Sequence, residues 1–227
     1  MGCAPDPAWY GRSMSRFTIL LGGTLTVTAR LRAQVAQTRV IAADSGIRHA
    51  EALGLVPELW IGDFDSVTEA ELARHDAVLR ETYPQDKDQT DGELALARAI
   101  ALGASEIVMV GAFGGDRMDH AFLHLTMAMA TSRPDLRVVL ASGDSEGTPL
   151  LPGPNPFDLP DGTLFSILAF SDLEGFSIAG AKWPLDGVQV PFGSSLTLSN
   201  VSRGKLSVTL GRGRAMLVAQ FPRPSDA

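Results

Sequence analysis

Hydrophobic and polar positions follow two different patterns along the chain, and the change between them falls near residue 141. Before that point, short strand-like runs, most of them apolar, alternate with segments in which apolar residues recur at helical spacing. The runs expected to form strands are 16–21, 39–43, 59–61, 77–82, 106–110 and 136–140. The segments expected to form helices are 27–35, 47–53, 68–75, 90–102 and 119–131. This alternation predicts a parallel sheet with right-handed crossovers, in a Rossmann-like α/β architecture.

Three of the expected helices carry a further signal. Segments 68–71 and 90–93 each place a threonine three residues before a glutamate, which is the capping-box pattern of a helix start. The segment 119–131 is apolar nearly all round. A helix of that kind is expected to be buried rather than to cover a surface.

The second pattern begins with a segment rich in proline and glycine, residues 142–162. Short strand-like runs without helical spacing follow it, at 163–170, 176–179, 195–199, 205–210 and 215–221. They predict an all-β domain, built as a sandwich or a partial barrel. We therefore expect a flexible tail at 1–15, an α/β domain at 16–145 and a smaller all-β domain at 146–227.

Composition narrows the possible partners and the compartment. The chain has 227 residues, 45% of them hydrophobic, and a net charge of −7, which argues against a nucleic-acid or anionic-membrane surface. The single cysteine, Cys3, allows no internal disulfide and fits a reducing cytoplasm. No apolar run approaches the roughly 18 residues of a membrane span, and no signal-peptide pattern opens the chain. The tail contains Met14, a second possible start.

Candidate chemistry begins where the third expected strand ends. Asp63 and Asp65 follow Gly62 there, two residues apart, and on an extended chain such residues point to the same side. Paired carboxylates at the carboxyl end of a strand suit Mg²⁺, which prefers oxygen ligands and phosphate oxygens. A plain polar turn is the alternative, because Asp, Gly and Ser are ordinary turn residues.

The other expected strands end in acidic residues as well. Because the carboxyl ends of parallel strands share one edge, we expect a common acidic rim with two cations in it. Its members are Asp44, Asp63, Asp65, Asp86, Asp88, Asp91, Asp116 and Asp119, with Lys87 and Arg117. Metal-bound triphosphate would balance such a rim. The alternatives are a solvated acidic edge and, for Asp91, a helix cap.

These motifs together resemble the thiamine pyrophosphokinase (thiamine diphosphokinase) family. The resemblance rests on the ordered segments 62–66, 87–91 and 114–120, supported by 43–46, 180–185, 192–195 and 199–200. One departure is Ser45, which stands where the family has a glycine in this turn. Serine disfavours the positive φ that glycine allows, so the backbone of this turn is expected to differ locally. The resemblance spans roughly residues 16–220. It implies transfer of an intact pyrophosphoryl group from ATP to the hydroxyl of thiamine, with release of AMP.

The resemblance also implies roles for single residues. Asp63, Asp65 and Asp91 match the positions that bind Mg²⁺ and carry catalysis. Lys87 and Arg117 are candidate phosphate contacts, and Asp44, Asp88 and Asp119 are further polar contacts to ATP. Trp183, Ser199 and Asn200 are the candidate thiamine platform, because an exposed tryptophan suits a flat cation. A homodimer is implied, with each site formed between the α/β domain of one subunit and the β domain of the other.

Several alternatives stay open. No Walker A sequence and no Gly-x-Gly-x-x-Gly sequence is present, so neither a P-loop nor a Rossmann dinucleotide site is expected. His120 and His124 stand one helical turn apart, as in a zinc pair, but no glutamate lies between them, and buried or capping histidines are the other interpretation. A core position is the alternative interpretation of Trp183.

The rival functions are another Mg²⁺-dependent phosphotransferase or phosphohydrolase, and a non-catalytic nucleotide or thiamine sensor. The sequence does not assign the general base.

Overall fold

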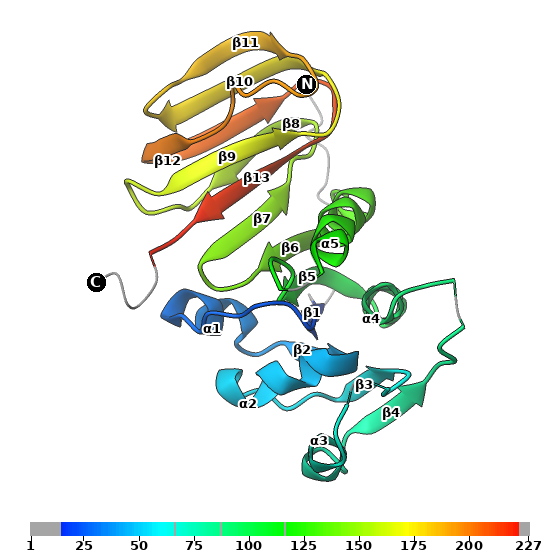
Figure 1. The fold of residues 1–227 in the computed structure, drawn as a ribbon. Helices are drawn as coiled ribbons and strands as arrows, with labels where there is room; N and C mark the ends of the chain where they lie inside the picture. Colours follow the sequence, from blue (N-terminus) through cyan, green and yellow to red (C-terminus); the bar gives the residue numbers. More distant parts are fainter. Residues whose placement is uncertain (1–14, 66, 87, 116, 223–227) are drawn as a thin grey trace, which may run out of the picture.

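The computed structural model describes residues 15–222 apart from 66, 87 and 116. The predicted tail, with Cys3 and Met14, therefore lies outside the described residues except for Ser15, which begins the first strand. The fold is mixed α/β, with strands joined side by side in the order β11-β10-β12-β9-β13-β7-β6-β5-β1-β2-β3-β4, and β8 added on β12 (Figure 1). One continuous run of paired strands thus passes through both halves of the chain.

Six parallel strands make up the N-terminal part of this sheet, as the alternating pattern predicted. They are β1 (Ser15–Leu20), β2 (Arg39–Ala43), β3 (Leu59–Gly62), β4 (Leu79–Thr82), β5 (Ala104–Val110) and β6 (Arg137–Ala141). β1 and β5 are neighbours although they are far apart in sequence. The chain runs outward from β1 to β4 and then returns beside β1 as β5, so the strand order reverses between these two strands. In open α/β sheets such a reversal marks the ligand crevice.

Helices cover both faces of the parallel strands. They are α1 (Ala29–Val35), the 3₁₀ helix η1 (Asp44–Arg48), α2 (His49–Leu53), α3 (Glu69–Arg74), α4 (Asp91–Ala101) and α5 (Met118–Thr131). Apolar residues of α4 and α5 share one core with one face of the sheet, and those of α1, η1 and α2 share another core with the opposite face. Both predicted capping boxes form, at α3 and at α4, so the sequence signal located these two helix starts correctly.

Helix α5 departs from the prediction that it is buried. His124, Met127 and Ala128 are its buried residues, whereas Phe122 is 59% exposed and Met118 is 83% exposed. The helix lies on one face of the sheet and leaves apolar side chains at the surface, a placement that its even apolar pattern did not reveal. Neither α5 nor any other helix in the described part of the chain is long and apolar enough to cross a membrane.

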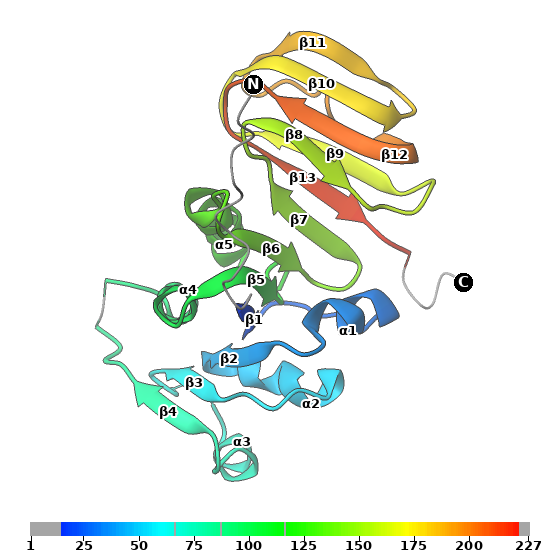
Figure 2. The ribbon, with the colours of Figure 1, turned by 180° about the vertical axis from the view of Figure 1, so that it is seen from behind.

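The C-terminal half is built from strands alone in the described residues. They are β7 (Ser145–Pro149), β8 (Gly153–Phe157), β9 (Leu164–Ala169), β10 (Leu173–Ala181), β11 (Leu185–Val190), β12 (Asn200–Leu210) and β13 (Ala215–Gln220). They enclose an apolar core of their own. β7 pairs with β6 on one side and with β13 on the other, so the two halves are joined by strand pairing (Figure 2).

Three expectations for this half were wrong. The segment 142–162 contains two strands, and the prolines of β8 fit because β8 pairs with β12 at an edge. The segment 185–190 forms β11, which the turn residues around it concealed. The expected strand at 195–199 is a loop, with Leu196 and Leu198 exposed and Thr197 buried. The leucines of this segment thus face solvent and the threonine between them faces the interior, which is the opposite of the arrangement expected for a strand with one buried apolar face.

Candidate active site

The carboxyl ends of the parallel strands surround a cavity of about 680 Å³, a size that suits a small-molecule ligand. The segments that line it follow β1, β2, β3, β4 and β5 and continue into α4 and α5. The lining residues are Leu21, Gly22, Gly23, Ala43, Asp44, Ser45, Asp63, Gln85, Gln89, Thr90, Asp91, Gly92, Gly114, Gly115, Arg117, His120, Ala121 and His124. The cavity thus lies where the strand order reverses, and all its described lining comes from the α/β half.

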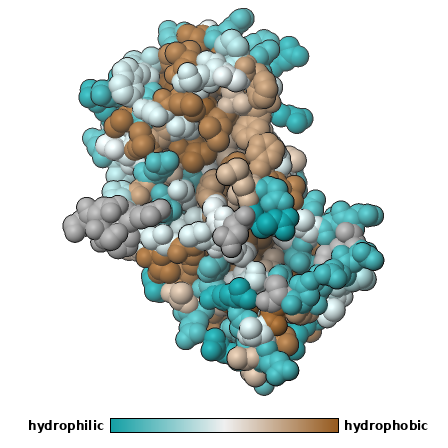
Figure 3. All heavy atoms as spheres, viewed as in Figure 1, coloured by the Kyte–Doolittle hydropathy of each residue, from teal (hydrophilic) through white to brown (hydrophobic). Residues whose placement is uncertain are grey.

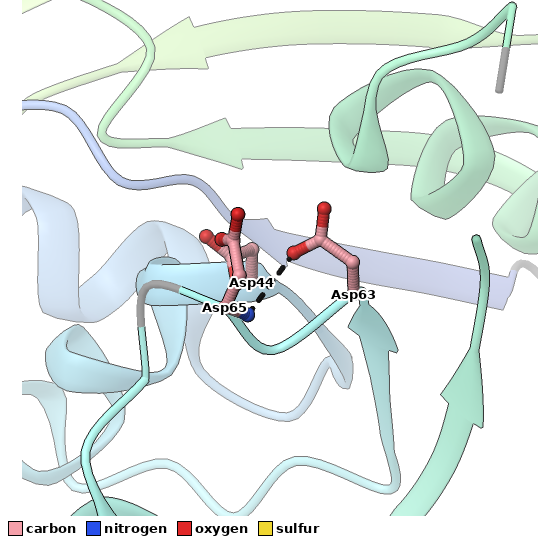
Figure 4. Close-up of side chains that lie close together, drawn as sticks. All are labelled: Asp44, Asp63 and Asp65. Carbon is pink, nitrogen blue, oxygen red and sulfur yellow. Dashed lines mark hydrogen bonds between the residues drawn. The ribbon is translucent and has the colours of Figure 1, made fainter. Parts of the chain in front are cut away.

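Three carboxylates meet at this rim. Asp44, Asp63 and Asp65 each offer a ligand oxygen, and these oxygens all lie within 4.8 Å of one another (Figure 4). The backbone N–H of Asp65 donates to Asp63 Oδ1 at 3.2 Å, and Gln85 Nε2 donates to Asp65 Oδ2 at 2.7 Å. Hard oxygen donors at this spacing fit a divalent cation such as Mg²⁺. The sequence predicted Asp63 and Asp65 for this purpose but placed Asp44 among the secondary contacts.

The turn after β3 brings Asp63 and Asp65 together in an unexpected way. The residue between them, Phe64, has a φ of 63°, so the backbone is left-handed there rather than extended. Such a conformation is unfavourable for a bulky residue. The Phe64 ring packs edge-on against Trp60, with 5.0 Å between the ring centroids, which holds the turn in place. The predicted convergence of the two carboxylates therefore comes from a strained turn.

Asp44 reaches the same point from the end of β2. Its φ is 42°, and its carbonyl accepts a hydrogen bond from Trp60 Nε1 at 2.9 Å. A Cβ added to Gly62 would lie 3.2 Å from Asp44 Cα, so glycine lets the two strand ends approach closely. The positive φ of this turn falls on Asp44, whereas Ser45 is not among the residues with positive φ. The departure from the family pattern at Ser45 therefore causes no backbone strain of its own.

Crowding of the carboxylates affects their ionisation. The pKa of Asp65 is raised, first by hydrogen bonding to Asp63 and by the charge of Asp63, and then by burial and by the charges of Asp44 and Asp91. Asp91 thus lies close enough to act electrostatically, and it lines the cavity at the start of α4, but it is not one of the three clustered carboxylates. A cation bound here would relieve the mutual repulsion.

We expect Asp65→Asn to stabilise the metal-free fold at neutral pH. The pKa of Asp65 is raised on folding, so this group favours the folded state below its unfolded pKa, and that contribution is lost as pH rises through the folded pKa. Asparagine removes the repulsion. In urea unfolding with EDTA, the variant should therefore exceed the wild type at pH 7 and match it near pH 3, below an unfolded pKa of about 3.9.

The control for this comparison is Asp76→Asn, an exposed aspartate outside the cavity lining. It should leave the urea midpoint close to wild type at both pH values. A constant difference between Asp65→Asn and wild type across this pH range would contradict the assigned repulsion.

The remaining predicted rim residues are spread out. Arg117 lines the cavity and pairs with Asp119 through Nε and Oδ1 at 3.0 Å, in contact with solvent, and this pairing lowers the pKa of Asp119 to about 2. Asp86 and Asp88 are exposed and do not belong to the cavity lining. Lys87 and Asp116 lie outside the described residues. The rim thus gathers fewer acids than the sequence suggested.

Sequence reasoning missed a group of lining residues that act through the backbone. Gly22 and Gly23 follow β1, and Gly114 and Gly115 follow β5. A Cβ on Gly23 would lie 2.3 Å from the carbonyl oxygen of Gly111, so the two loops touch through backbone atoms. Glycine pairs in the loops that follow buried strands were the available signal. They leave main-chain groups open to a ligand.

The two cavity histidines do not form a zinc pair with a third ligand among the described residues. Their ring centroids are 6.4 Å apart. His124 is buried, and its Nδ1 lies 3.0 Å from the carbonyl oxygen of Ala112. The interpretation of His124 as a buried histidine is therefore confirmed.

The candidate acceptor platform lies in the other half of the chain. Trp183 is 53% exposed at the turn between β10 and β11, which excludes a core role, and Lys182 Nζ lies 4.3 Å from the centre of its ring. Asn200 is buried; its Oδ1 accepts from Trp183 N–H at 3.1 Å, and its Nδ2 donates to the Trp183 carbonyl at 2.8 Å. The side chain of Asn200 therefore positions Trp183. Ser199 has a φ of 57°, and its N–H donates to Ser166 Oγ. None of these residues lines the cavity.

Comparisons with known proteins agree with this architecture. Residues 32–140 match the model of the thiamin pyrophosphokinase catalytic domain, and residues 156–214 match that of the thiamin pyrophosphokinase vitamin B1 binding domain. Thiamine pyrophosphokinase of Bacillus subtilis (strain 168) is 29% identical over 206 residues, which span 87% of this chain and 96% of the relative.

Solved structures share the fold. The crystal structure of thiamine pyrophosphokinase from Bacillus subtilis has a TM-score of 0.82 at 24% identity, covering 92% of this chain and 100% of that one. The enzyme from Candida albicans has a TM-score of 0.71 at 13% identity, covering 92% and 90%. Taken with the two domain models, which between them match most of the chain, these findings show that the chain belongs to the thiamin pyrophosphokinase family.

Proposed function

We propose that this chain is a thiamine pyrophosphokinase that transfers the pyrophosphoryl group of Mg-ATP to the hydroxyl of thiamine, forming thiamine diphosphate and AMP. Family membership supports the activity, and the single cysteine at position 3 supports a cytoplasmic location. The observation that carries the proposal is the meeting of Asp44, Asp63 and Asp65 at the mouth of a cavity at the strand-order reversal. That arrangement suits a metal-bound polyphosphate.

The clustered carboxylates of Asp44, Asp63 and Asp65 fit Mg²⁺. We propose Asp63, Asp65 and Asp91 as its ligands, because Asp91 matches the family position and lines the same cavity, with Asp44 as a further carboxylate beside them. A bound Mg²⁺ would neutralise charge on the phosphates of ATP. Arg117 also lines the cavity, and its guanidinium group is available to a phosphate of ATP if the phosphate replaces Asp119 as its hydrogen-bond partner. Lys87 is a further phosphate contact in the proposal. The glycine loops after β1 and β5 let the ligand approach the backbone.

The reaction requires alignment more than covalent help from the protein. The hydroxyl oxygen of thiamine forms a bond to the β-phosphorus of ATP. The bond from that phosphorus to the oxygen of the α-phosphate breaks, so AMP leaves, and the hydroxyl proton passes to a base at the rim. The residues of this chain hold the phosphates and bring the two reactants into line.

A single assay tests the proposal against its rivals. Purified protein is incubated with ATP and Mg²⁺, with and without thiamine, and AMP is measured. A thiamine pyrophosphokinase makes AMP only when thiamine is present, and thiamine diphosphate appears in equal amount. A phosphohydrolase would consume ATP without thiamine, and a sensor would make no AMP under either condition.

The site is proposed to be completed by a second subunit. The described cavity lining comes from residues 21–124, while the thiamine platform around Trp183 lies in the C-terminal half. Large apolar side chains are exposed on both parts, with Trp183, Phe192, Leu196 and Leu198 in one and Met118 and Phe122 in the other. Hydrophobic residues also gather over the upper part of the face drawn in Figure 3. A homodimer that places the platform of one subunit over the cavity of its partner would use these surfaces.

Trp183→Ala should weaken thiamine binding by about 1–2 kcal/mol, the scale of a partly desolvated cation–π contact. The exposed indole ring is the reason, because thiamine carries a flat cationic ring. Titration calorimetry with thiamine and, separately, with Mg-ATP provides the measurement. Trp183→Phe keeps an aromatic face and should lose less. Equal losses of thiamine and ATP affinity in Trp183→Ala would mean that the ring supports the fold instead.

A further inference from the structure

His124 is a buried group at the ligand cavity that the proposed mechanism does not use. It lies in the middle of α5, and its side chain both lines the cavity and packs inside the molecule. Its Nδ1 is 3.0 Å from the carbonyl oxygen of Ala112. Within the described part of the chain, no hydrogen bond is made at Nε2.

The contact with Ala112 decides which nitrogen carries the proton. A carbonyl oxygen can only accept, so Nδ1 must be the protonated nitrogen of this ring. Burial lowers the pKa of His124, more than its contact with Ala112 raises it. The ring is therefore neutral at pH 7, and Nε2 presents a lone pair.

Gly92 leaves room beside that lone pair. A Cβ added to Gly92 would lie 3.7 Å from His124 Nε2 and 3.1 Å from Leu21 Cδ2. Gly92, Leu21 and His124 all line the cavity. The second residue of α4 is thus a glycine where it faces the accepting nitrogen of α5.

A buried acceptor at a ligand site needs a donor from the ligand. Ionised phosphate groups offer only acceptor oxygens, so they do not match a lone pair. The nucleoside part of ATP offers O–H groups on the ribose and an N–H group on the base. We propose that His124 Nε2 accepts a hydrogen bond from an uncharged donor of the ATP nucleoside, which makes His124 a nucleotide-specificity residue. This inference rests on the proposed use of ATP at this cavity.

The test compares ATP with three analogues that each lack one donor: 2′-deoxy-ATP, 3′-deoxy-ATP and purine riboside triphosphate. Binding to the full chain is measured by calorimetry with Mg²⁺ and without thiamine. Wild type should bind one analogue about 3- to 10-fold more weakly than ATP, the range of one hydrogen bond. The His124→Asn variant should bind ATP more weakly than wild type by the same factor. Its affinity for the discriminated analogue should equal that of wild type, because that analogue lacks the donor. Asparagine keeps a donor near the position of Nδ1 for Ala112 but has no atom at the position of Nε2.

His75→Asn is the matched control. His75 follows α3, with its ring centroid 6.0 Å from that of Trp60, and it does not line the cavity. The His75→Asn variant should bind ATP and the three analogues with wild-type affinity. Unchanged ATP affinity in His124→Asn, or an equal loss for ATP and all three analogues, would overturn the inference while the AMP assay still supports the enzyme. If wild type binds no ATP, the proposed function itself fails and the inference with it.

A measurement on the wild-type protein covers the case in which His124→Asn does not fold. Nitrogen-15 spectra of the histidine rings report which ring nitrogen is protonated. The expected result is a protonated Nδ1 in His124 and a shift of its Nε2 signal when ATP is added, and a smaller shift with the discriminated analogue. A protonated Nε2, or a signal that ATP leaves unchanged, would overturn the inference.

Discussion

Asp63→Asn is expected to lower kcat for AMP formation by about 10²- to 10³-fold, the effect of losing one strong electrostatic stabiliser. Asp63 lines the cavity and shares the carboxylate cluster with Asp44 and Asp65. Asparagine keeps the size of the side chain and one oxygen that can accept from the N–H of Asp65. The turn should therefore persist while the charge that would hold Mg²⁺ is reduced.

Two measurements separate chemistry from folding in this variant. Circular dichroism should give a wild-type spectrum, and thermal unfolding should show a smaller rise in Tm on adding Mg²⁺ than wild type shows, because ligand binding stabilises the folded state. Asp76→Asn, an exposed site outside the cavity lining, is the control and should keep full activity. Near-normal turnover in both Asp63→Asn and Asp91→Asn would remove these residues from the metal site.

Mixed dimers are expected to regain activity when each parent is impaired in a different half of the site. An Asp63→Asn chain loses the metal end, and a Trp183→Ala chain loses the platform. If sites are shared between subunits, one site of each mixed dimer combines two intact halves. Random mixing makes half the dimers mixed, so about one quarter of wild-type activity should return at limiting thiamine, where Trp183→Ala is weakest. Subunits are exchanged by co-expression or by refolding together.

The matched control pairs two variants of the same half. A mixture of Asp63→Asn and Asp65→Asn chains should stay as inactive as its parents, because no mixed dimer then contains an intact metal end. Differently tagged chains allow the mixed dimer to be purified before the assay. A purified mixed dimer of Asp63→Asn and Trp183→Ala that is no more active than its parents would mean that each chain forms its own site.

Local sequence signals located the elements of the α/β half well. Apolar runs marked most of the six parallel strands, although β4, with the sequence LRET, is largely exposed. The threonine–glutamate pairs at 68–71 and 90–93 marked two helix starts. These signals depend on neighbours along the chain, such as the hydrogen bond from Glu93 N–H to Thr90 Oγ, so the sequence contains them fully. In the β half, the same reasoning missed β7 and β8, whose partners β13 and β12 lie far along the chain. It also missed β11, which pairs with its chain neighbour β10 but is flanked by turn residues.

The acidic rim shows where sequence reasoning reached its limit. It predicted that Asp63 and Asp65 converge, and they do, but through a left-handed Phe64 that packing on Trp60 supports. It did not rank Asp44 with them, because that approach depends on Gly62 and on the pairing of β2 with β3. The inferred accepting nitrogen of His124 likewise follows from the carbonyl of Ala112, twelve residues away.

By itself, then, the sequence determined the alternation of strands and helices, the acidic strand ends and the family, because these are properties of local order and residue type. Only the tertiary structure decided which carboxylates share one point, which histidine nitrogen carries a proton, and that Trp183 lies outside the cavity formed by its own α/β half. These depend on contacts between segments far apart in sequence, whose geometry is set when strands pair and side chains pack.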